Sequence, residues 1–296
     1  MDNTTRRLAY VLVDVFSSRP LEGNQLAVFT DGRDLSDAEM QALAREMNLS
    51  ETTFVLPRDA ATEQQNGVRV RIFTVEEEMF FAGHPALGTA AVIRGTSRAD
   101  EVRLELGVGT IPVSFHDDGD AVFGEMRQRD PEFGAVHERE PVARAAGLAA
   151  DDLADDLPIQ TVSTGLPFTI VPVRRLKTMR CLNLDFARAS AYLEPSGGKF
   201  FYFVCRETVD PAARLHARMI FYNGEDPATG SAAGCCAAWA VAHGVTPAGE
   251  RALIEQGLEC KRPSRIFVRA DRSGDRIINV RVGGNVVEIG RGTIFL

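Results

Sequence analysis

The sequence contains no run that approaches the roughly 20 consecutive apolar residues of a membrane-spanning helix. Its first residues, MDNTTRRLAYVLVDVF, lack the apolar segment and small-residue cleavage site of a secretory signal peptide. Lysine and arginine form no block, and the net charge of −8 gives no basic footprint for nucleic acid. These absences predict a cytoplasmic protein that has neither a membrane nor a nucleic acid as partner.

Cysteine and histidine are too few and too scattered to indicate a metal site. The five cysteines are odd in number and include no C-x-x-C spacing, which argues against structural disulfides and zinc. The dinucleotide fingerprint G-x-G-x-x-G, the P-loop and the motifs H-E-x-x-H and G-x-S-x-G are also absent. The chemistry that remains is proton transfer without a cofactor or metal, which needs only positioned acids and bases.

An eight-residue phrase occurs twice in the chain. Residues 84–91 read HPALGTAA, and residues 226–233 read DPATGSAA. In each copy a strand-like run comes before the phrase, and a stretch of small apolar residues follows it. An internal repeat of this kind indicates a duplicated fold.

The two copies predict two buried helices, over 85–95 and 227–243. Proline directly after a polar residue is typical of the first helical position, so His84 and Asp226 are expected to precede the helices, with Asp226 as N-cap. A helix that is apolar all round must be covered on every side. We therefore expect an α+β fold of two pseudo-symmetric domains, each a curved, mostly antiparallel sheet around one central buried helix.

The positions of the repeats also predict the extent of each domain. The N-terminal domain is expected over 1–118 and the C-terminal domain over 119–284, with the last strand, 285–296, packing back onto the N-terminal domain. Near the start of the chain, Ser36 and Glu39 form a capping box that predicts the beginning of a further helix.

The helix starts are candidate binding sites for an anion. A helix start exposes unpaired N–H groups and the positive end of the helix dipole, which together bind carboxylate or stabilise an oxyanion. His84 and Asp226 place a proton-exchanging side chain at each start. Thr89 and Ser231, five residues further on, could hold a ligand or bond back to the helix. Read alone, His84 could equally be a packed imidazole and Asp226 an ordinary cap.

Glu51, in the stretch MNLSETTFVL, is a candidate acid/base. It follows a predicted helix at the point where the chain turns into an apolar strand. Neighbours such as Leu49, Phe54 and Val55 favour partial desolvation, which raises the pKa of a carboxyl group toward the range useful for proton transfer. The alternative is a surface or capping carboxylate.

With these motifs the chain resembles the PhzF family, named for the isomerase of phenazine biosynthesis. The shared stretches run over nearly the whole length: VDVFSSRPLEGNQLAVF, LAREMNLSETTFV, RIFT, FAGHPALGTA, EDPATGSAAG, QG followed by RPS, and GRGTIFL. The resemblance implies a diaminopimelate-epimerase-like fold of two similar domains with the active site between them. It also implies a homodimer that binds a small-molecule carboxylate and needs no cofactor.

The resemblance further implies roles for named residues. Glu51 of the NLSE motif would be the general acid/base, while His84 and Asp226 orient the substrate and assist proton transfer, and Ser231 binds a polar group. For the named isomerase the substrate is trans-2,3-dihydro-3-hydroxyanthranilate, from which a glutamate removes the proton at C3 and returns one at C1. The enol product then becomes a ketone.

The backbone at Gly83 and Gly230 is expected to contact the substrate, and Pro227 departs from the family pattern, which has alanine there.

Two alternatives stay open. One is a racemase or epimerase of a small amino or hydroxy acid, although the related epimerases use two cysteines where this chain has His84 and Asp226. The other is a non-catalytic protein that binds a small carboxylate, against which Glu51 counts because it would repel an anionic ligand.

Overall fold

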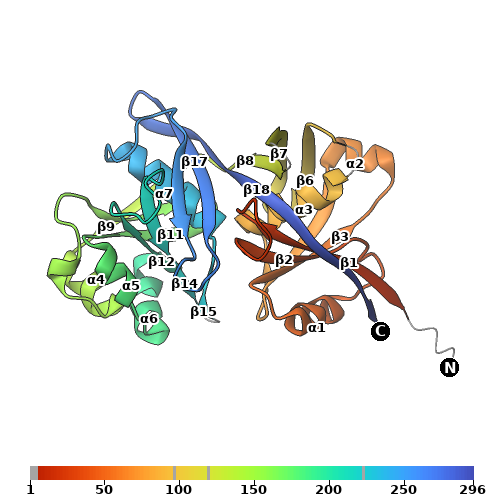
Figure 1. Cartoon of the computed structure of the whole chain (residues 1–296), viewed down its shortest axis with the longest axis horizontal. Helices are drawn as coiled ribbons and strands as arrows, with labels where there is room; N and C mark the ends of the chain where they lie inside the picture. Colours follow the sequence, from red (N-terminus) through yellow and green to blue (C-terminus); the bar gives the residue numbers. More distant parts are fainter. Residues whose placement is uncertain (1–5, 96–97, 119–120, 222–223) are drawn as a thin grey trace. The chain divides into compact units, whose positions relative to one another are not determined.

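The structure, a computed structural model, describes residues 6–95, 98–118, 121–221 and 224–296. Contacts along the chain divide it into two units. The first comprises residues up to 126 together with 284–296, and the second comprises residues 127–283. Figure 1 traces the elements of both units in chain order. The expected domain extents of 1–118 and 119–284 stay a prediction.

Eight strands close into a barrel in the first unit. In order around the barrel they are β1 (Arg7–Val15), β2 (Asn24–Phe29), β3 (Glu51–Leu56), β4 (Val68–Phe73), β6 (Glu101–Leu106), β7 (Gly109–Asp118), β8 (Ala121–Arg127) and β18 (Arg276–Phe295). β1 pairs with both β2 and β18, which closes the barrel. The short strand β5 (Glu78–Met79) pairs with β4.

Three helices accompany these strands: α1 (Asp37–Met47), α2 (Ala60–Asn66) and α3 (Gly83–Arg94). The predicted capping box at the start of α1 is confirmed, because Ser36 Oγ accepts from Glu39 N at 3.3 Å and Glu39 Oε2 accepts from Ser36 N at 2.8 Å. Met40 of α1 lies in a buried cluster with Phe54 of β3. This packing leads the chain from the end of α1 into β3.

The central helix α3 packs directly on the barrel strands. Its first eight residues are all buried. Gly88 permits this close approach, because a Cβ at that position would lie 2.7 Å from Leu26 Cδ2 and 2.8 Å from Val15 Cγ2. The burial expected for a helix that is apolar all round is therefore confirmed.

The start of α3 differs slightly from the expected range of 85–95. The helix begins at Gly83 and ends at Arg94, so His84 is its second residue rather than the residue before it. Pro85 is tolerated as the third residue, because an amide in the first helical turn would have no intrahelical partner in any case.

The second unit repeats the sheet around another central helix. Its strands are, along the sheet, β9 (Glu132–His137), β10 (Ile159–Ser163), β11 (Pro167–Val173), β12 (Phe200–Cys205), β13 (Leu215–Arg218), β16 (Ala252–Gln256), β17 (Ser264–Ser273) and the first part of β18. A separate hairpin joins β14 (Ile220–Phe221) to β15 (Gly224–Glu225).

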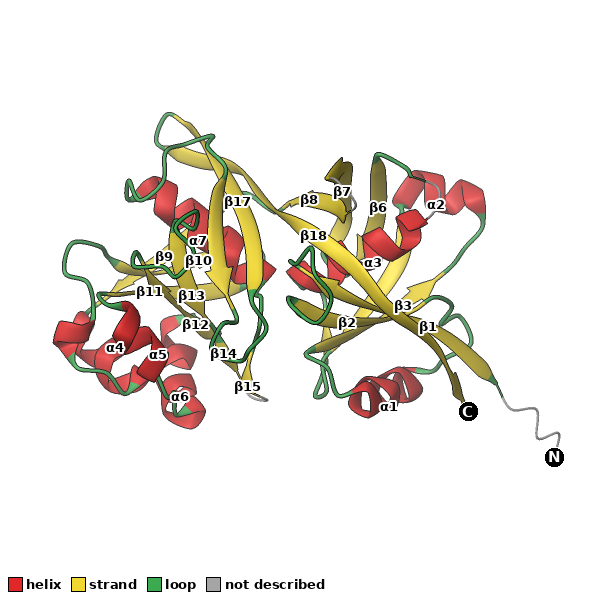
Figure 2. Cartoon of the chain, viewed as in Figure 1, coloured by secondary structure: helices red, strands yellow, loops and turns green. Residues whose placement is uncertain are grey.

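The helices of the second unit are α4 (Arg139–Ala146), α5 (Leu176–Cys181), α6 (Phe186–Ser196) and the central α7 (Gly230–Ala242), with a 3₁₀ turn at Ala150–Asp152. Figure 2 shows α4, α5 and α6 grouped together, apart from α7, which lies among the strands. The three grouped helices share a buried cluster with β11 and β12. No helix within the described ranges is long and apolar enough to cross a membrane.

The order of strand directions confirms the duplicated α+β fold. The pairs β1–β2, β2–β3, β3–β4, β4–β6, β6–β7 and β7–β8 are antiparallel, parallel, antiparallel, parallel, antiparallel and antiparallel. The pairs β10–β11, β11–β12, β12–β13, β13–β16, β16–β17 and β17–β18 give the same series. Along the chain, the central helix of each unit comes between the two strands that form the second parallel pair of its series.

A bidentate ion pair is a second trace of the duplication, which the sequence analysis missed. Arg71 donates to both oxygens of Glu78 at 2.7 and 2.6 Å, and Arg218 donates to both oxygens of Glu225 at 2.8 and 2.6 Å. In each pair the arginine and the glutamate are seven residues apart in the chain. The arginines lie on β4 and β13, and the glutamates lie on the short strands β5 and β15, which come before the central helices. Each pair therefore fixes the approach of the chain to its central helix.

The second copy of the phrase does not begin its helix where the sequence predicts. α7 starts at Gly230 with Thr229 as N-cap, and it ends at Ala242. The expected range of 227–243, with Asp226 as N-cap and Pro227 as first helical residue, is therefore wrong at its start. Side-chain hydrogen bonds hold residues 226–229 in an extended loop instead.

The tight packing of α3 predicts a large cost for added volume at Gly88. We expect Gly88→Val to lower the free energy of unfolding by about 1–3 kcal/mol, because the new methyl groups must displace strand side chains. Gly290→Val in β18 is the matched control, since a Cβ there meets no atom within 4 Å. Thermal or urea unfolding of both variants measures the difference. Equal stability of the two variants would contradict this account of α3.

Candidate functional site

Glu51 is buried at the beginning of β3. α1 ends at Met47, its C-cap Asn48 adopts the left-handed conformation, and the chain enters the strand three residues after Asn48. Glu51 is the first strand residue, opposite Leu26 of the parallel strand β2, and is 9 % exposed. The burial expected from its apolar neighbours is confirmed, and the predicted rise of its pKa stays a prediction.

His84 lies next to Glu51. Its Nε2 atom is 3.5 Å from Glu51 Oε2, and its Nδ1 atom is 3.1 Å from the side-chain nitrogen of Asn24. When the Asn24 amide donates to Nδ1, the neutral imidazole carries its proton on Nε2, the atom that faces Glu51. Burial lowers the pKa of His84 to about 3, and contact with the Gln25 backbone opposes this only in part. His84 is therefore neutral at physiological pH.

Asn24 is a site residue that the sequence analysis missed. It is 1 % exposed and lies at the start of β2, directly after Gly23. Gly23 has a φ of 71°, and a Cβ there would lie 2.4 Å from Val15 O. Only glycine fits this turn, which brings Asn24 to His84. The signal was present in the stretch PLEGNQ, although nothing in it points to His84 as the partner.

Asp226 lies in the loop between β15 and α7 and is 4 % exposed. Its Oδ2 atom accepts a hydrogen bond from Thr229 Oγ1 at 2.7 Å. Its backbone carbonyl accepts from Gln256 Nε2 at 2.8 Å, and its backbone N–H donates to Met219 O at 2.9 Å. The residue is thus held through its side chain and its backbone at the approach to α7, although it does not cap the helix.

The first residues of both central helices are the two glycines expected to contact substrate. Gly83 opens α3 and Gly230 opens α7, and neither helix has a side-chain hydrogen bond at its N-cap. Each N-terminal turn can therefore offer amide hydrogens and a positive dipole end to an anion. Because a glycine opens each helix, a ligand can approach the backbone closely at that residue.

The two hydroxyl residues of the repeated phrase have different environments. Thr89 Oγ1 lies 2.8 Å from Thr53 Oγ1 of β3, so it ties α3 to the barrel. Ser231 is 7 % exposed, and its hydroxyl makes no hydrogen bond to any residue that the structure describes. Of the two, Ser231 is therefore the one that can bind a ligand.

A buried ionic group lies behind the Asp226 loop. His216 is fully buried, with Nδ1 at 2.9 Å from Glu255 Oε1 and Nε2 at 3.3 Å from Glu259 Oε1. Burial lowers the pKa of His216, but hydrogen bonds and charge from Glu259 and Glu255 outweigh it, and the net shift is upward. Arg218, which binds Glu225, also lies 4.0 Å from Glu259.

The cysteines of α7 have a packing role. Cys235 and Cys236 are fully buried, and burial raises the pKa of the Cys235 thiol to about 11 and that of Cys236 further. Neither thiol is suited to proton transfer near neutral pH. Among the residues that the structure describes, no cluster of His, Cys, Asp and Glu could hold a metal ion.

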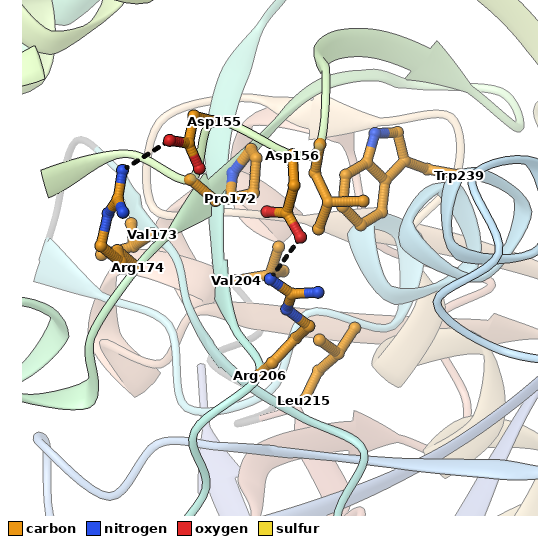
Figure 3. Close-up of a pocket in the computed structure, with 11 residues that line it drawn as sticks. Asp155, Asp156, Pro172, Val173, Arg174, Val204, Arg206, Leu215 and Trp239 are labelled. Atoms are coloured by element: carbon orange, nitrogen blue, oxygen red, sulfur yellow. Dashed lines mark hydrogen bonds and ion pairs between the residues drawn. The ribbon is translucent and has the colours of Figure 1, made fainter. Parts of the chain in front are cut away.

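Figure 3 shows a pocket of about 270 Å³ in the second unit that contains none of the predicted site residues. Its rim carries two ion pairs, Arg174 with Asp155 at 3.3 Å and Arg206 with Asp156 at 2.7 Å. Trp239 lines the pocket, and its indole N–H donates a hydrogen bond to a backbone carbonyl. Because these polar groups bind one another, the pocket is not assigned to the site.

Comparisons with known proteins agree over nearly the whole chain. The family model described as phenazine biosynthesis-like protein, PhzC-PhzF, matches residues 13–292. Trans-2,3-dihydro-3-hydroxyanthranilate isomerase of Pseudomonas chlororaphis is 36% identical, covering 97% of this chain and 99% of its own. A predicted epimerase from Pseudomonas aeruginosa has a TM-score of 0.84 at 37% identity, covering 97% of this chain and 99% of its own. A PhzF family protein from Bacillus anthracis has a TM-score of 0.87 at 25% identity, covering 98% and 100%.

The two buried histidines are expected to differ in charge at pH 6. His84 should be neutral, because its pKa is lowered to about 3, and His216 should be an imidazolium, because its pKa is raised. His84 then destabilises the folded state as the pH falls from 6.5 toward 3, since only the unfolded chain takes up the proton. The contribution of His216 is complete below 6.5 and is lost as the pH rises through its raised pKa.

Nitrogen-15 NMR of the imidazole rings, assigned with His84→Gln and His216→Gln, measures both protonation states. An imidazolium signal for His84 at pH 6 would show that the contact with Glu51 is an ion pair instead.

Proposed function

The chain belongs to the phenazine biosynthesis-like family and is an isomerase of the PhzF type, and on this premise we propose that it moves a proton within a small carboxylate-bearing substrate without a cofactor. The observation that carries the proposal is the buried pair of Glu51 and His84, 3.5 Å apart. Homodimer assembly and a cytoplasmic location, which the family resemblance and the sequence suggest, are part of the same proposal.

Glu51 acts as the general acid/base in this mechanism. Its carboxylate removes a proton from a carbon atom of the substrate and delivers one to a second carbon. A protonated His84 would form an ion pair with Glu51 and reduce the basicity of the carboxylate. Because burial keeps His84 neutral, the imidazole can orient the carboxylate and leave it able to accept a proton.

The remaining predicted residues bind and orient the same substrate. The N-terminal turns that begin at Gly83 and Gly230 provide amide hydrogens for its carboxylate. Ser231 donates to a polar group, which is supported by its lack of a partner within the described chain. Asp226 accepts a hydrogen bond from the substrate and assists proton transfer.

The substrate to test first is trans-2,3-dihydro-3-hydroxyanthranilate, because the relative from Pseudomonas chlororaphis is named as its isomerase. In this reaction Glu51 removes the proton at C3 and returns a proton to C1, and the enol product becomes a ketone. An epimerase would instead invert one stereocentre. The high pKa of the Cys235 thiol, raised by burial to about 11, argues against a two-thiol mechanism of that kind.

Replacing Glu51 with glutamine should lower turnover by 10²–10⁴-fold or more, because the amide cannot take up the proton. The assay is conversion of trans-2,3-dihydro-3-hydroxyanthranilate in D₂O, with deuterium at C1 of the product read by NMR. Glu46→Gln, an exposed position at the end of α1, is the matched control and should retain activity.

Activity of Glu51→Gln within threefold of wild type would rule out the assigned role of Glu51. If wild type leaves this compound unchanged, the compound is excluded as substrate. Deuterium exchange into a set of other small carboxylates then tests the general proposal.

A further inference from the structure

Gln256, the last residue of β16, makes hydrogen bonds through every polar position of its side chain. Its Nε2 atom donates to Asp226 O at 2.8 Å and to Thr229 Oγ1 at 2.9 Å. Its Oε1 atom accepts from Tyr202 OH at 3.0 Å and from Thr229 N at 3.3 Å. Gln256 and Tyr202 are both fully buried. A buried amide with all its hydrogen bonds satisfied is locked in one orientation.

The backbone of residues 226–229 determines which way this amide faces, because the Asp226 carbonyl can only accept from Nε2 and the Thr229 N–H can only donate to Oε1. Burial raises the pKa of the phenol well above its ordinary value of 10, so the hydroxyl keeps its proton and donates it to Gln256 Oε1. Nε2 of Gln256 faces Thr229 and Asp226. Since Thr229 Oγ1 accepts from this nitrogen, its own single proton is directed to Asp226 Oδ2, 2.7 Å away. The chain of hydrogen bonds therefore runs one way, from Tyr202 and Gln256 through Thr229 to Asp226.

We propose that Gln256 and Thr229 are positioning residues that keep the Asp226 carboxylate ionised and fixed in orientation. The inference rests on the proposed function, in which Asp226 contacts the substrate. A hydroxyl that donates to a carboxylate oxygen stabilises the charged carboxylate and holds that oxygen in place.

Comparison of the two phrase copies supports a specific role for Thr229. The corresponding position in the first copy is Leu87, which is fully buried in the core and has no hydroxyl to donate. There the phrase is helical from Gly83 onward, whereas residues 226–229 are held out of the helix. The hydrogen bonds of Thr229 are thus present only where the phrase begins with aspartate.

The titratable groups near Asp226 are Glu225, Cys260 and Tyr202. Glu225 precedes it in β15 and is bound by Arg218. Cys260, in the loop after β16, has its pKa raised to about 11, first by burial and then by the charges of Glu225 and Asp226. Tyr202 of β12 likewise has its pKa raised by burial and in part by Asp226.

The test is the titration of Asp226 in the full-length protein. Carbon-13 NMR of aspartate-labelled chain, with Asp226→Asn to assign the signal, gives its pKa in wild type and in Thr229→Val. Loss of the donated hydrogen bond should raise this pKa by about one unit. Thr229→Ser, which keeps the hydroxyl, should restore the wild-type value. This measurement needs no turnover, so it separates the inference from the proposed function.

Thr169→Val is the matched control, because Thr169 is a fully buried threonine of the same unit whose Oγ1 lies 2.8 Å from Thr161 Oγ1. It should leave the Asp226 titration unchanged. If the proposed reaction is observed, Thr229→Val should lower kcat about tenfold and move the acidic limb of its pH profile upward, while Thr169→Val should do neither.

An Asp226 titration that is the same in Thr229→Val and wild type would overturn the inference. So would an equal shift in Thr169→Val, since it would show a general effect of lost hydroxyls. If the titration shifts as expected but the isomerase assay detects no turnover, the inference about the hydrogen bonds is supported and the proposed substrate is excluded.

Discussion

The burial of a central helix on all sides is the constraint on which the rest of each unit depends. A helix without a polar face can present polar groups only at its ends. In both units the sheet covers the helix body, while a glycine opens the helix and no side chain caps it. Chemistry is therefore concentrated at the two starts, and the strands around them supply the remaining groups, Glu51 in one unit and Gln256 in the other.

The sequence predicted the duplicated fold because the signal was repeated and local. The same phrase opened two stretches of small apolar residues, and a helix of that composition has to be enclosed. The helix start at Gly230 could not be predicted in the same way. It depends on Gln256, which lies 27 residues from Thr229 in the chain and reaches it only through the folded sheet.

The residues of the candidate site also differ in whether a local signal in the sequence could predict them. Glu51 and His84 were found from their local setting, and their contact is a product of the fold. Asn24 was missed because its partner His84 lies 60 residues away. The seven-residue spacing of Arg71 and Glu78, repeated in Arg218 and Glu225, was visible in the sequence, but charge pairs at that spacing have no fixed meaning outside a known hairpin.

The two copies of the phrase have diverged in how they control a titratable side chain. In the first copy, burial makes His84 neutral. Its partner is Glu51, whose proposed role requires a carboxylate that can take up a proton. In the second, a buried carboxylate receives a directed hydroxyl from Thr229. A proton-transfer site needs groups held in different protonation states at one pH. The two helix starts thus differ in their titratable residue, His84 or Asp226, and in the residue three positions later, Leu87 or Thr229.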